Sequence, residues 1–445
     1  MKSVTPSLAA LCALLVAAAA PAAAACPQPA HLDSYGTKAP YGPRQNPASY
    51  ALAPAGFVPV FTENVSRHGS RAATGSDDGD LVLALWKKAS DAGQLTRKGE
   101  EFGPRVTALL AAMAEVGYGN LSGRGREELR ETADRMAARV PSLFADIAAK
   151  GKKIDVVSSG QGRAIDSADE YAGELAAKDP ALKPLIGATR TDKDLLYFHK
   201  SAGGKAYRDY IANDQRLAAT LKSLTDQPKT GQAATSVLRG LFKKPFVDGL
   251  SAPDRLAAAE AVYNLYAIAP AMIQESPDGK GWGLDRYISR TDAAWFGYLS
   301  DAEDFYEKGP GFSDSDITYK MADVLLDDFF KQVEAKKSGT STLGAELRFT
   351  HAEEIIPLAA LMGLPGSTKP ATPGAPYTYK NNPWRGADVS PLGANIQWDV
   401  YEKGTQYLVR MLYNEKEVPF KAGCEPIKKG SKFYDFQELQ RCFGR

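Results

Sequence analysis

The chain has 445 residues, a length that supplies one large domain or two ordinary ones with a proper hydrophobic core. Its apolar fraction of 44% and charged fraction of 24% are those of a folded globular protein, not of a disordered or membrane-embedded chain. The formal net charge of +1 argues against nucleic acid or a membrane surface as a general partner, so any site for an anion must be a local concentration of charge.

The N-terminal residues 1–25 are a predicted signal peptide, because a positive start precedes an apolar run too short to span a bilayer and a small-residue cleavage site. We therefore expect an exported protein, periplasmic or extracellular. Cys26 follows the cleavage site directly, which leaves open a lipid anchor in a membrane, a free thiol or a disulfide. Cys424 and Cys442 lie close together in sequence and predict a disulfide that clips the C-terminal segment.

Residues 27–56 are rich in Pro, Gly and Tyr and predict an irregular arm, which carries Lys38. The apolar run 57–61 then predicts the end of a buried strand. A strand of this kind delivers the residues that follow it to the rim of an α/β sheet, where open α/β folds bind ligands.

Arg67, His68 and Arg71 come to that rim. Arginine is suited to bidentate contact with phosphate oxygens. A third positive charge between two arginines is disfavoured, so the imidazole is driven toward its neutral, nucleophilic form. The segment predicts a nucleophilic histidine in a phosphate cradle; the structural alternative is an exposed basic turn.

Apolar residues at helical spacing then predict three helices, at 80–89, 99–116 and 125–149, the last interrupted at Pro141. Residues 153–159 predict a second buried strand, and Arg163 follows at the beginning of another helix. Positive charge at a helix N-terminus opposes the helix dipole, which indicates an anionic partner there. A solvated arginine is the alternative.

Strand signals nearly vanish from about 166 to 340, where the clearest helical runs are 206–224, 253–273 and 316–336. We interpret this region as a mainly helical domain inserted into the α/β unit, where it forms one wall of a cleft. The mature chain would then divide into 27–165, 166–340 and 341–445. Within the insertion we expect a structural role for His199.

Strand character returns at 345–350 and runs into His351 and Glu353, ahead of a helix at 355–362. A strand-to-helix turn can aim an imidazole and a carboxylate at one pocket; a capping acid beside a structural histidine is the alternative. The rest of the chain predicts a loop at 366–393, hairpin strands at 394–401 and 406–413, and a short helix over 433–442.

The three strand ends together resemble the histidine acid phosphatases, the branch of the histidine phosphatase superfamily that carries an inserted helical domain. Residues 67–74 are similar to that family's RHGxRxPT signature, although Ala73 replaces the proline and removes a rigid φ. Residues 158–163 resemble the second, arginine-supplying element. His351-Ala352-Glu353 is the form typical of the multiple inositol polyphosphate phosphatases, one clade of phytases.

Further similarities to that clade extend over nearly the whole mature chain, at 35–41, 303–306, 394–396 and 412–415. The fold that the resemblance implies is α/β: a central mixed sheet flanked by helices, with an inserted mainly helical domain.

The resemblance also implies a phosphomonoesterase in which His68 attacks phosphorus and forms a phosphohistidine. The phosphoryl oxygens would be held by Arg67, Arg71, Arg163 and His351. Glu353 would protonate the leaving oxygen, with Glu354 as the alternative donor. No metal or other cofactor is expected, because the arginines supply the positive field.

The expected substrates are small phosphate esters, with inositol hexakisphosphate (phytate) first. A sixfold phosphorylated ring needs cationic contacts beyond the cradle, and Lys38 is the candidate because it lies in the clade-like arm. Two alternatives remain: a broad acid phosphatase that acts on sugar phosphates, and a polyanion-binding protein that has lost turnover.

Overall fold

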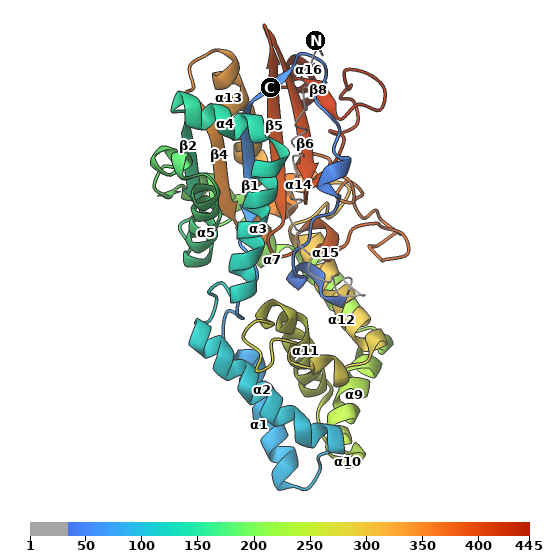
Figure 1. Cartoon of the computed structure of the whole chain (residues 1–445). Helices are drawn as coiled ribbons and strands as arrows, with labels where there is room; N and C mark the ends of the chain where they lie inside the picture. The colour runs from blue at the N-terminus through green and yellow to red at the C-terminus, as the bar shows by residue number, and fades with distance from the viewer. Residues whose placement is uncertain (1–33) are drawn as a thin grey trace, which may run out of the picture.

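The structure is a computed structural model that describes residues 34–445. The predicted signal peptide and Cys26 lie outside the described residues. Figure 1 shows a sheet with helices on both faces and, below it, a layer built of helices. The central mixed sheet flanked by helices confirms the predicted fold class.

The described residues form one mixed sheet with the strand order β3-β2-β4-β1-β5-β6-β7, and β8 pairs with β6. The strands are β1 (Val58–Arg67), β2 (Lys153–Ser158), β3 (Arg190–Thr191), β4 (Leu343–Thr350), β5 (Asn395–Lys403), β6 (Gln406–Tyr413), β7 (Lys416–Glu417) and β8 (Phe433–Asp435). The strands from β3 to β1 are parallel, and those from β5 onward run antiparallel to their neighbours. The carboxyl ends of β1, β4 and β2 therefore meet at one edge of the sheet.

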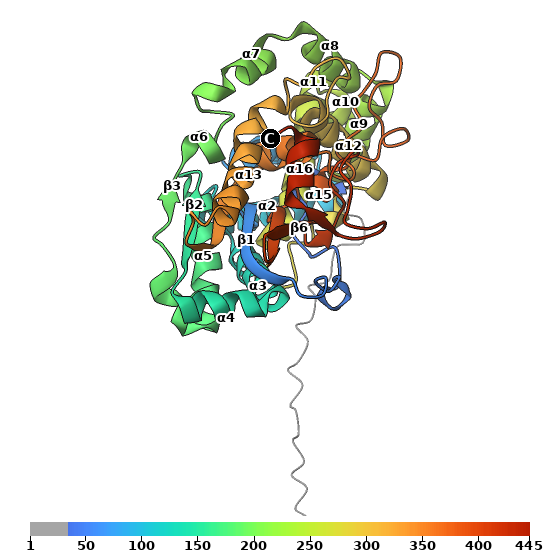
Figure 2. The ribbon, with the colours of Figure 1, turned by 90° about the horizontal axis from the view of Figure 1, so that it is seen from above.

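One face of the sheet is covered by α3 (Gly123–Arg139), α4 (Pro141–Lys150) and α5 (Gly162–Lys178), whose apolar residues pack on alternate residues of β4. The opposite face packs against α13 (Asp323–Lys337), α14 (Ala352–Leu361) and α16 (Phe436–Phe443). Figure 2 shows the two sets of helices on either side of the strands. Burial on both faces favours apolar side chains in these strands, but β4 also buries Glu346 and Arg348, which are paired with each other at 3.3 Å.

The helical layer has its own apolar core, which joins two remote parts of the chain. Its helices are α1 (Asp77–Asp91), α2 (Arg97–Val116), α9 (Pro228–Leu241), α10 (Lys244–Asp248), α11 (Ala252–Ile268) and α12 (Arg290–Glu307). The division at 166 and 340 stays a prediction. The packing sets α5 against the sheet and adds α1 and α2 to the helical layer.

Several sequence-based boundaries differ from the structure. The strand expected at 57–61 runs on to Arg67, so the sheet itself carries the first arginine. The run 206–224 is two helices, α7 (Lys205–Asn213) and α8 (Gln215–Thr225), because the Asp214 side chain accepts from Leu217 N and begins a new helix. The helix expected from 316 begins at Asp323. The first three residues of the expected C-terminal helix form β8.

The C-terminal segment is fixed by the predicted disulfide between Cys424 and Cys442, whose Cα atoms are 5.2 Å apart. The remaining short helices are α6 (Lys193–Leu196) and α15 (Gly386–Val389), and a 3₁₀ turn at Gly36–Lys38 lies in the N-terminal arm. Within 34–445, no helix combines the length and the apolar character needed to cross a membrane.

Candidate active site

Three strand ends bring the candidate residues together. Arg67, the last residue of β1, is in register with Thr350, the last residue of β4. His68 N donates to Thr350 O at 2.9 Å, so the residues that follow the two strands, His68 and His351, are neighbours. Their ring centroids are 5.4 Å apart. Two imidazoles that are far apart in sequence therefore share one buried pocket.

The His68 imidazole is held in one tautomer. Its Nδ1 lies 2.9 Å from the Gly69 carbonyl oxygen, and since a carbonyl only accepts, Nδ1 carries the proton and Nε2 keeps its lone pair. Burial, with Arg67, His351 and Arg71 nearby, lowers the pKa of His68 well below its ordinary value. The ring is neutral, with Nε2 available as a nucleophile.

Three guanidinium groups surround this imidazole. Arg67 Nη1 donates to Thr37 O and Ser390 O, each at 2.6 Å, and Arg71 Nη1 donates to Ala72 O at 2.8 Å. The Nε atoms of Arg67, Arg71 and Arg163 are buried and have no hydrogen-bond partner among the described residues. Burial lowers the pKa of Arg67 and of Arg71 to about 10 in each case. Buried like charges with free donors are suited to an anion.

His351 and Glu353 complete the pocket from the beginning of α14. His351 is the N-cap residue, and its Nε2 lies 2.8 Å from Ser159 Oγ, beyond β2. Burial, with Arg163 next, lowers the pKa of His351 to about 3. Burial alone would raise the pKa of Glu353, but the charge of Lys308 and the nearby imidazoles outweigh it and hold that pKa at about 2. The Glu353 side chain is 32% exposed, so it faces the open side of the pocket.

The neighbouring Glu354 has a different environment. Its side chain is fully buried, with Oε1 2.5 Å from His199 Nδ1 and Oε2 accepting from Thr350 Oγ1 at 2.9 Å. Both oxygens are used inside the protein, so Glu354 ties α14 to the segment after α6. Glu353 is therefore the carboxyl that faces the cradle, and His199 has the structural partner that the sequence led us to expect.

The loop after His68 is held by α3. The Glu128 carboxylate accepts from Ser70 N at 2.8 Å, from Ser70 Oγ at 2.9 Å and from Arg124 Nε at 3.0 Å. The helix can come this close because Gly125 has no side chain: a Cβ there would lie 1.9 Å from the Ser70 carbonyl oxygen. The glycine thus allows a close backbone contact two residues from His68.

Backbone hydrogen bonds to the segment before α3 also fix this loop. Ala72 N donates to Asn120 O at 3.0 Å, Gly119 N donates to Ala73 O at 2.7 Å, and Ser122 N donates to Ser70 O at 3.0 Å. Ala73 stands where the family signature has proline, and its carbonyl oxygen accepts one of these hydrogen bonds.

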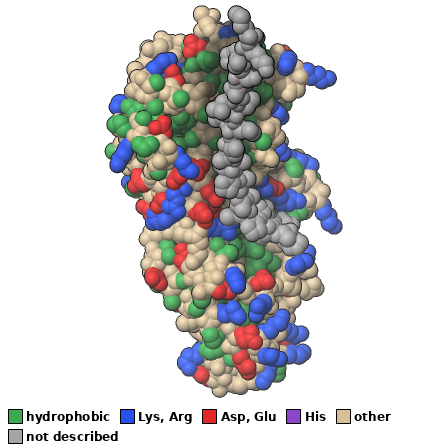
Figure 3. Space-filling model, viewed as in Figure 1, with side chains coloured by type: hydrophobic (Ala, Val, Ile, Leu, Met, Phe, Trp, Pro, Cys, Tyr) green, Lys and Arg blue, Asp and Glu red, His purple; other side chains and the backbone are tan. Residues whose placement is uncertain are grey.

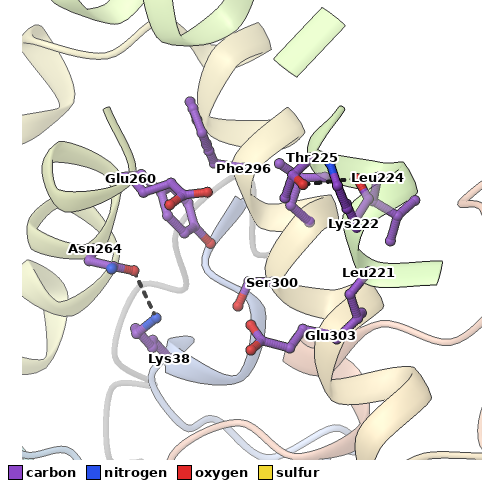
Figure 4. Close-up of a pocket in the computed structure, with 12 residues that line it drawn as sticks. Lys38, Leu221, Lys222, Leu224, Thr225, Glu260, Asn264, Phe296, Ser300 and Glu303 are labelled. Carbon is purple, nitrogen blue, oxygen red and sulfur yellow. Dashed lines mark hydrogen bonds between the residues drawn. The ribbon is translucent and has the colours of Figure 1, made fainter. Parts of the chain in front are cut away.

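Lys38 lies beside the cradle, in a second wall of the site. Its Nζ donates to Asn264 Oδ1 at 3.3 Å, and it faces a cavity of about 540 Å³ that is also lined by Glu260 of α11 and Glu303 of α12 (Figure 4). A smaller adjoining cavity of about 120 Å³ is lined by both Lys38 and Arg71. The ammonium group thus lies between the cradle and the larger cavity, which carries two carboxyls as well.

The positive charge of the pocket is local. On the face shown in Figure 3, Lys and Arg side chains are interspersed with Asp and Glu side chains. Arg126 and Arg130 of α3, for example, are both paired with Glu170 of α5, at 2.7 and 2.6 Å. Across 34–445, no group of three or more His, Cys, Asp or Glu side chains is placed to hold a metal ion.

Sequence reasoning missed two charged groups of the site. Glu128 lies on a helix whose many charges suggest a solvated face, and Lys308 follows α12 in a segment that reads as a polar connector. A signal for Lys308 was present, because it comes four residues after Asp304 of the clade-like segment 303–306. That spacing places the two side chains on one face of a helix.

A neutral imidazole among buried guanidinium groups, at the carboxyl edge of a mixed sheet, is an arrangement for handling phosphoryl groups. The fold and the pocket define the class as a phosphatase, a hydrolase of phosphate esters. The family model described as the histidine phosphatase superfamily (branch 2) matches residues 61–414. The chain belongs to this superfamily.

Individual relatives narrow the comparison. A crystal structure of the *Bifidobacterium longum* multiple inositol polyphosphate phosphatase in complex with inositol hexasulfate is 33% identical, with a TM-score of 0.85, and covers 92% of this chain and 97% of that chain. Multiple inositol polyphosphate phosphatase 1 of *Gallus gallus* is 25% identical over 89% of this chain and 85% of its own length. A phytase from *D. castellii*, 16% identical with a TM-score of 0.66, shares the fold.

Proposed function

We propose that the chain is an exported phosphatase that hydrolyses inositol polyphosphates, inositol hexakisphosphate among them, through a phosphohistidine on His68. The observation that carries the proposal is the convergence of three remote strand ends on one pocket, with a free imidazole nitrogen, three guanidinium groups and one partly exposed carboxyl. The inositol phosphate substrate is supported by the names of the relatives, and the inositol hexasulfate bound to one of them is the sulfate counterpart of phytate.

In the first step, a bond forms between His68 Nε2 and phosphorus while the bond from phosphorus to the ester oxygen breaks. The leaving oxygen takes the electron pair and the proton of Glu353, because an alkoxide is a poor leaving group. Arg67, Arg71 and Arg163 hold the phosphoryl oxygens, where the transition-state charge is spread. If Ser159 donates to His351 Nε2, the proton of His351 is on Nδ1 and points to the same oxygens.

In the second step, a water attacks phosphorus and the bond to His68 Nε2 breaks. The Glu353 carboxylate left by the first step accepts a proton from that water, and inorganic phosphate leaves. Since the pKa of Glu353 is about 2 in the empty site, proton uptake accompanies substrate binding. The phosphate dianion offsets the arginine charges and raises the pKa of the carboxyl, so the enzyme works best in acid.

A broad phosphatase for sugar phosphates is the second candidate, and one observation favours it. The cavity beside Lys38 is lined by Glu260 and Glu303, and these carboxylates repel a substrate with several phosphate groups when they are ionised. Burial raises the pKa of both carboxyls, so the repulsion fades in acid. We therefore expect the preference for inositol hexakisphosphate over a sugar phosphate to be greater in acid than at neutral pH.

The test compares phosphate release by the purified mature protein from inositol hexakisphosphate, glucose 6-phosphate and p-nitrophenyl phosphate. Our proposal predicts the highest kcat/KM for the inositol ester in acid. A higher value for the sugar ester at every pH would favour the broad phosphatase. Binding of inositol hexakisphosphate without release of phosphate from any of the three esters would favour the polyanion-binding protein.

Export is proposed from the predicted signal peptide and the Cys424–Cys442 disulfide, a bond that persists in oxidising compartments. The mass of the mature protein separates cleavage after residue 25 alone from cleavage with acylation of Cys26, which adds the mass of the lipid.

A further inference from the structure

An ion pair at the end of α12 lies beside the proposed proton donor. Lys308 Nζ is 2.6 Å from Asp304 Oδ1 and 3.9 Å from Glu353 Oε1, and its side chain is only 16% exposed. Lys308 follows the last turn of α12, where the helix dipole favours a cation. One largely buried ammonium group therefore lies between the carboxyl groups of Asp304 and Glu353.

The same ion pair reaches the phosphate cradle through the N-terminal arm. Asp304 Oδ2 accepts from Thr37 Oγ1 at 3.0 Å, and Thr37 O accepts from Arg67 Nη1 at 2.6 Å. A continuous series of contacts thus joins the carboxyl of Glu353 to the guanidinium group of Arg67. It passes through Lys308, Asp304 and the arm.

Other charged groups also surround Glu353. The cationic or imidazole groups are Arg67 at the end of β1, Arg71 after it, His199 after α6, and His351 before α14. The acidic groups and phenols are Asp304 and Glu307 of α12, Glu354 of α14, Tyr197 after α6 and Tyr207 of α7.

Most of these neighbours are committed elsewhere. Arg67 and Arg71 face the phosphate and are neutralised when the ester binds, while His199 is paired with Glu354. Lys308 keeps its charge: burial lowers its pKa, but Asp304, Glu353 and Glu307 outweigh burial and hold that pKa well above its ordinary value. Lys308 is thus a permanent positive charge that acts on Glu353 with or without substrate.

We propose that Lys308, held by Asp304, is a positioning residue that sets the pH above which Glu353 loses its proton and can no longer act on an alkyl ester. The inference rests on the proposed function, because it assigns Glu353 as the proton donor. The ammonium group favours the carboxylate, so it keeps Glu353 ionised in the empty site and confines proton donation to the phosphate-bound state. Its removal should extend activity toward higher pH.

The size of the effect follows from the distance. At 3.9 Å, loss of one positive charge raises the pKa of Glu353 by roughly one unit in a water-like medium and by about three at an effective dielectric constant of 20. We expect Lys308→Met to move the alkaline limb of the rate of phosphoenzyme formation upward by at least about one pH unit. Lys308→Arg keeps the charge and should leave the limb near its wild-type position.

Asp304→Asn should shift the alkaline limb of phosphoenzyme formation in the opposite direction. It removes a negative charge and frees Lys308 to pair with Glu353 alone, so the alkaline limb should move downward. Damage to packing alone would lower the rate of both variants without shifting their limbs in opposite directions. Asp304→Asn also keeps the inference testable where Lys308→Met does not fold.

The experiment measures phosphoenzyme formation by rapid quench over the pH range in which each variant is folded, with inositol hexakisphosphate and with p-nitrophenyl phosphate. The nitrophenolate leaves without a proton donor, so the shifts should appear with the inositol ester and not with the nitrophenyl ester. Lys87→Met is the matched control, since Lys87 also pairs with an aspartate four residues away, on the exposed face of α1; its profile should be that of the wild type.

The role of Lys308 would be overturned if the alkaline limbs of the pH profiles coincide in the wild type, Lys308→Met and Asp304→Asn. The proposed function would still stand, provided that the wild type forms the phosphoenzyme. A shift of equal size in Lys87→Met would overturn it as well. A wild-type protein that forms no phosphoenzyme with either ester would overturn the proposed function and the inference together.

Discussion

Replacement of Asp301 with asparagine should remove a pH-dependent part of the stability. Asp301 is fully buried between α12 and the arm, and its Oδ2 accepts from Tyr379 OH at 2.6 Å and from Gly386 N at 3.0 Å. Its Oδ1 has no partner among the described residues and lies against the arm turn at Gly36. An asparagine with its oxygen in place of Oδ2 reproduces the protonated acid.

The magnitude follows from the pKa. Burial raises the pKa of Asp301 from 3.8 to about 7, a rise of about three units, or about 4 kcal/mol. Because the folded state binds this proton more tightly than the unfolded state, the stabilisation is fully present below about pH 4. It is lost progressively as the pH rises to about 7.

The assay is urea unfolding of the wild type and of Asp301→Asn in acid and at slightly alkaline pH. The two proteins should be equally stable in acid, and the variant should be more stable at alkaline pH by up to about 4 kcal/mol. Asp316→Asn, at an exposed aspartate, should follow the wild type. The reasoning is refuted if Asp301→Asn loses as much stability as the wild type over the same pH interval.

Three further predictions concern the site and the C-terminus. Glu128→Gln leaves Arg124 as an unpaired buried charge and frees the Ser70 loop, so the free energy of unfolding should fall by about 3–5 kcal/mol and phosphoenzyme formation should slow. Glu127→Gln, on the exposed side of α3, should change neither quantity. Equal effects of the two substitutions would show that Glu128 does not hold the Ser70 loop. Lys38→Met should raise KM for inositol hexakisphosphate far more than for p-nitrophenyl phosphate, since only the larger ester extends past the cradle, and equal increases would argue against a contact at Lys38. Replacing both Cys424 and Cys442 with serine opens a loop that spans 18 residues and should lower the free energy of unfolding in urea by about 3 kcal/mol. Turnover by the folded protein should not change. A lower kcat would show that the disulfide affects the geometry of the active site.

The central strands of the sheet and the candidate site residues that follow them were predictable from local sequence patterns. The runs at 153–159 and 345–350 have strand character and are largely buried in the sheet, although Glu346 and Arg348 alternate with the apolar residues of the second run. His68 and His351 directly follow β1 and β4, and parallel pairing of the two strands makes the two ring positions neighbours. The candidate site residues can be predicted from the sequence because they directly follow predicted strands.

The supports of the site were not predictable, because their meaning depends on contacts between remote segments. Glu128 resembles any charged residue of an amphipathic helix until the close approach at Gly125 brings it to Ser70. The spacing of Lys308 from Asp304 indicates an ion pair, but its place in the site depends on the turn before α14, which puts Glu353 beside it. The break at Asp214 was also missed, because a capping side chain ends an apolar pattern that continues through it.

The account depends most directly on the atom that receives the phosphoryl group. Alkaline quench of the wild-type protein with ³²P-labelled inositol phosphate, followed by peptide mapping at alkaline pH, should give an acid-labile, base-stable label on the peptide that contains His68. The label should be on Nε2, because Nδ1 donates to the Gly69 carbonyl. Label on His351 or on another residue, or turnover without any labelled peptide, would contradict the account.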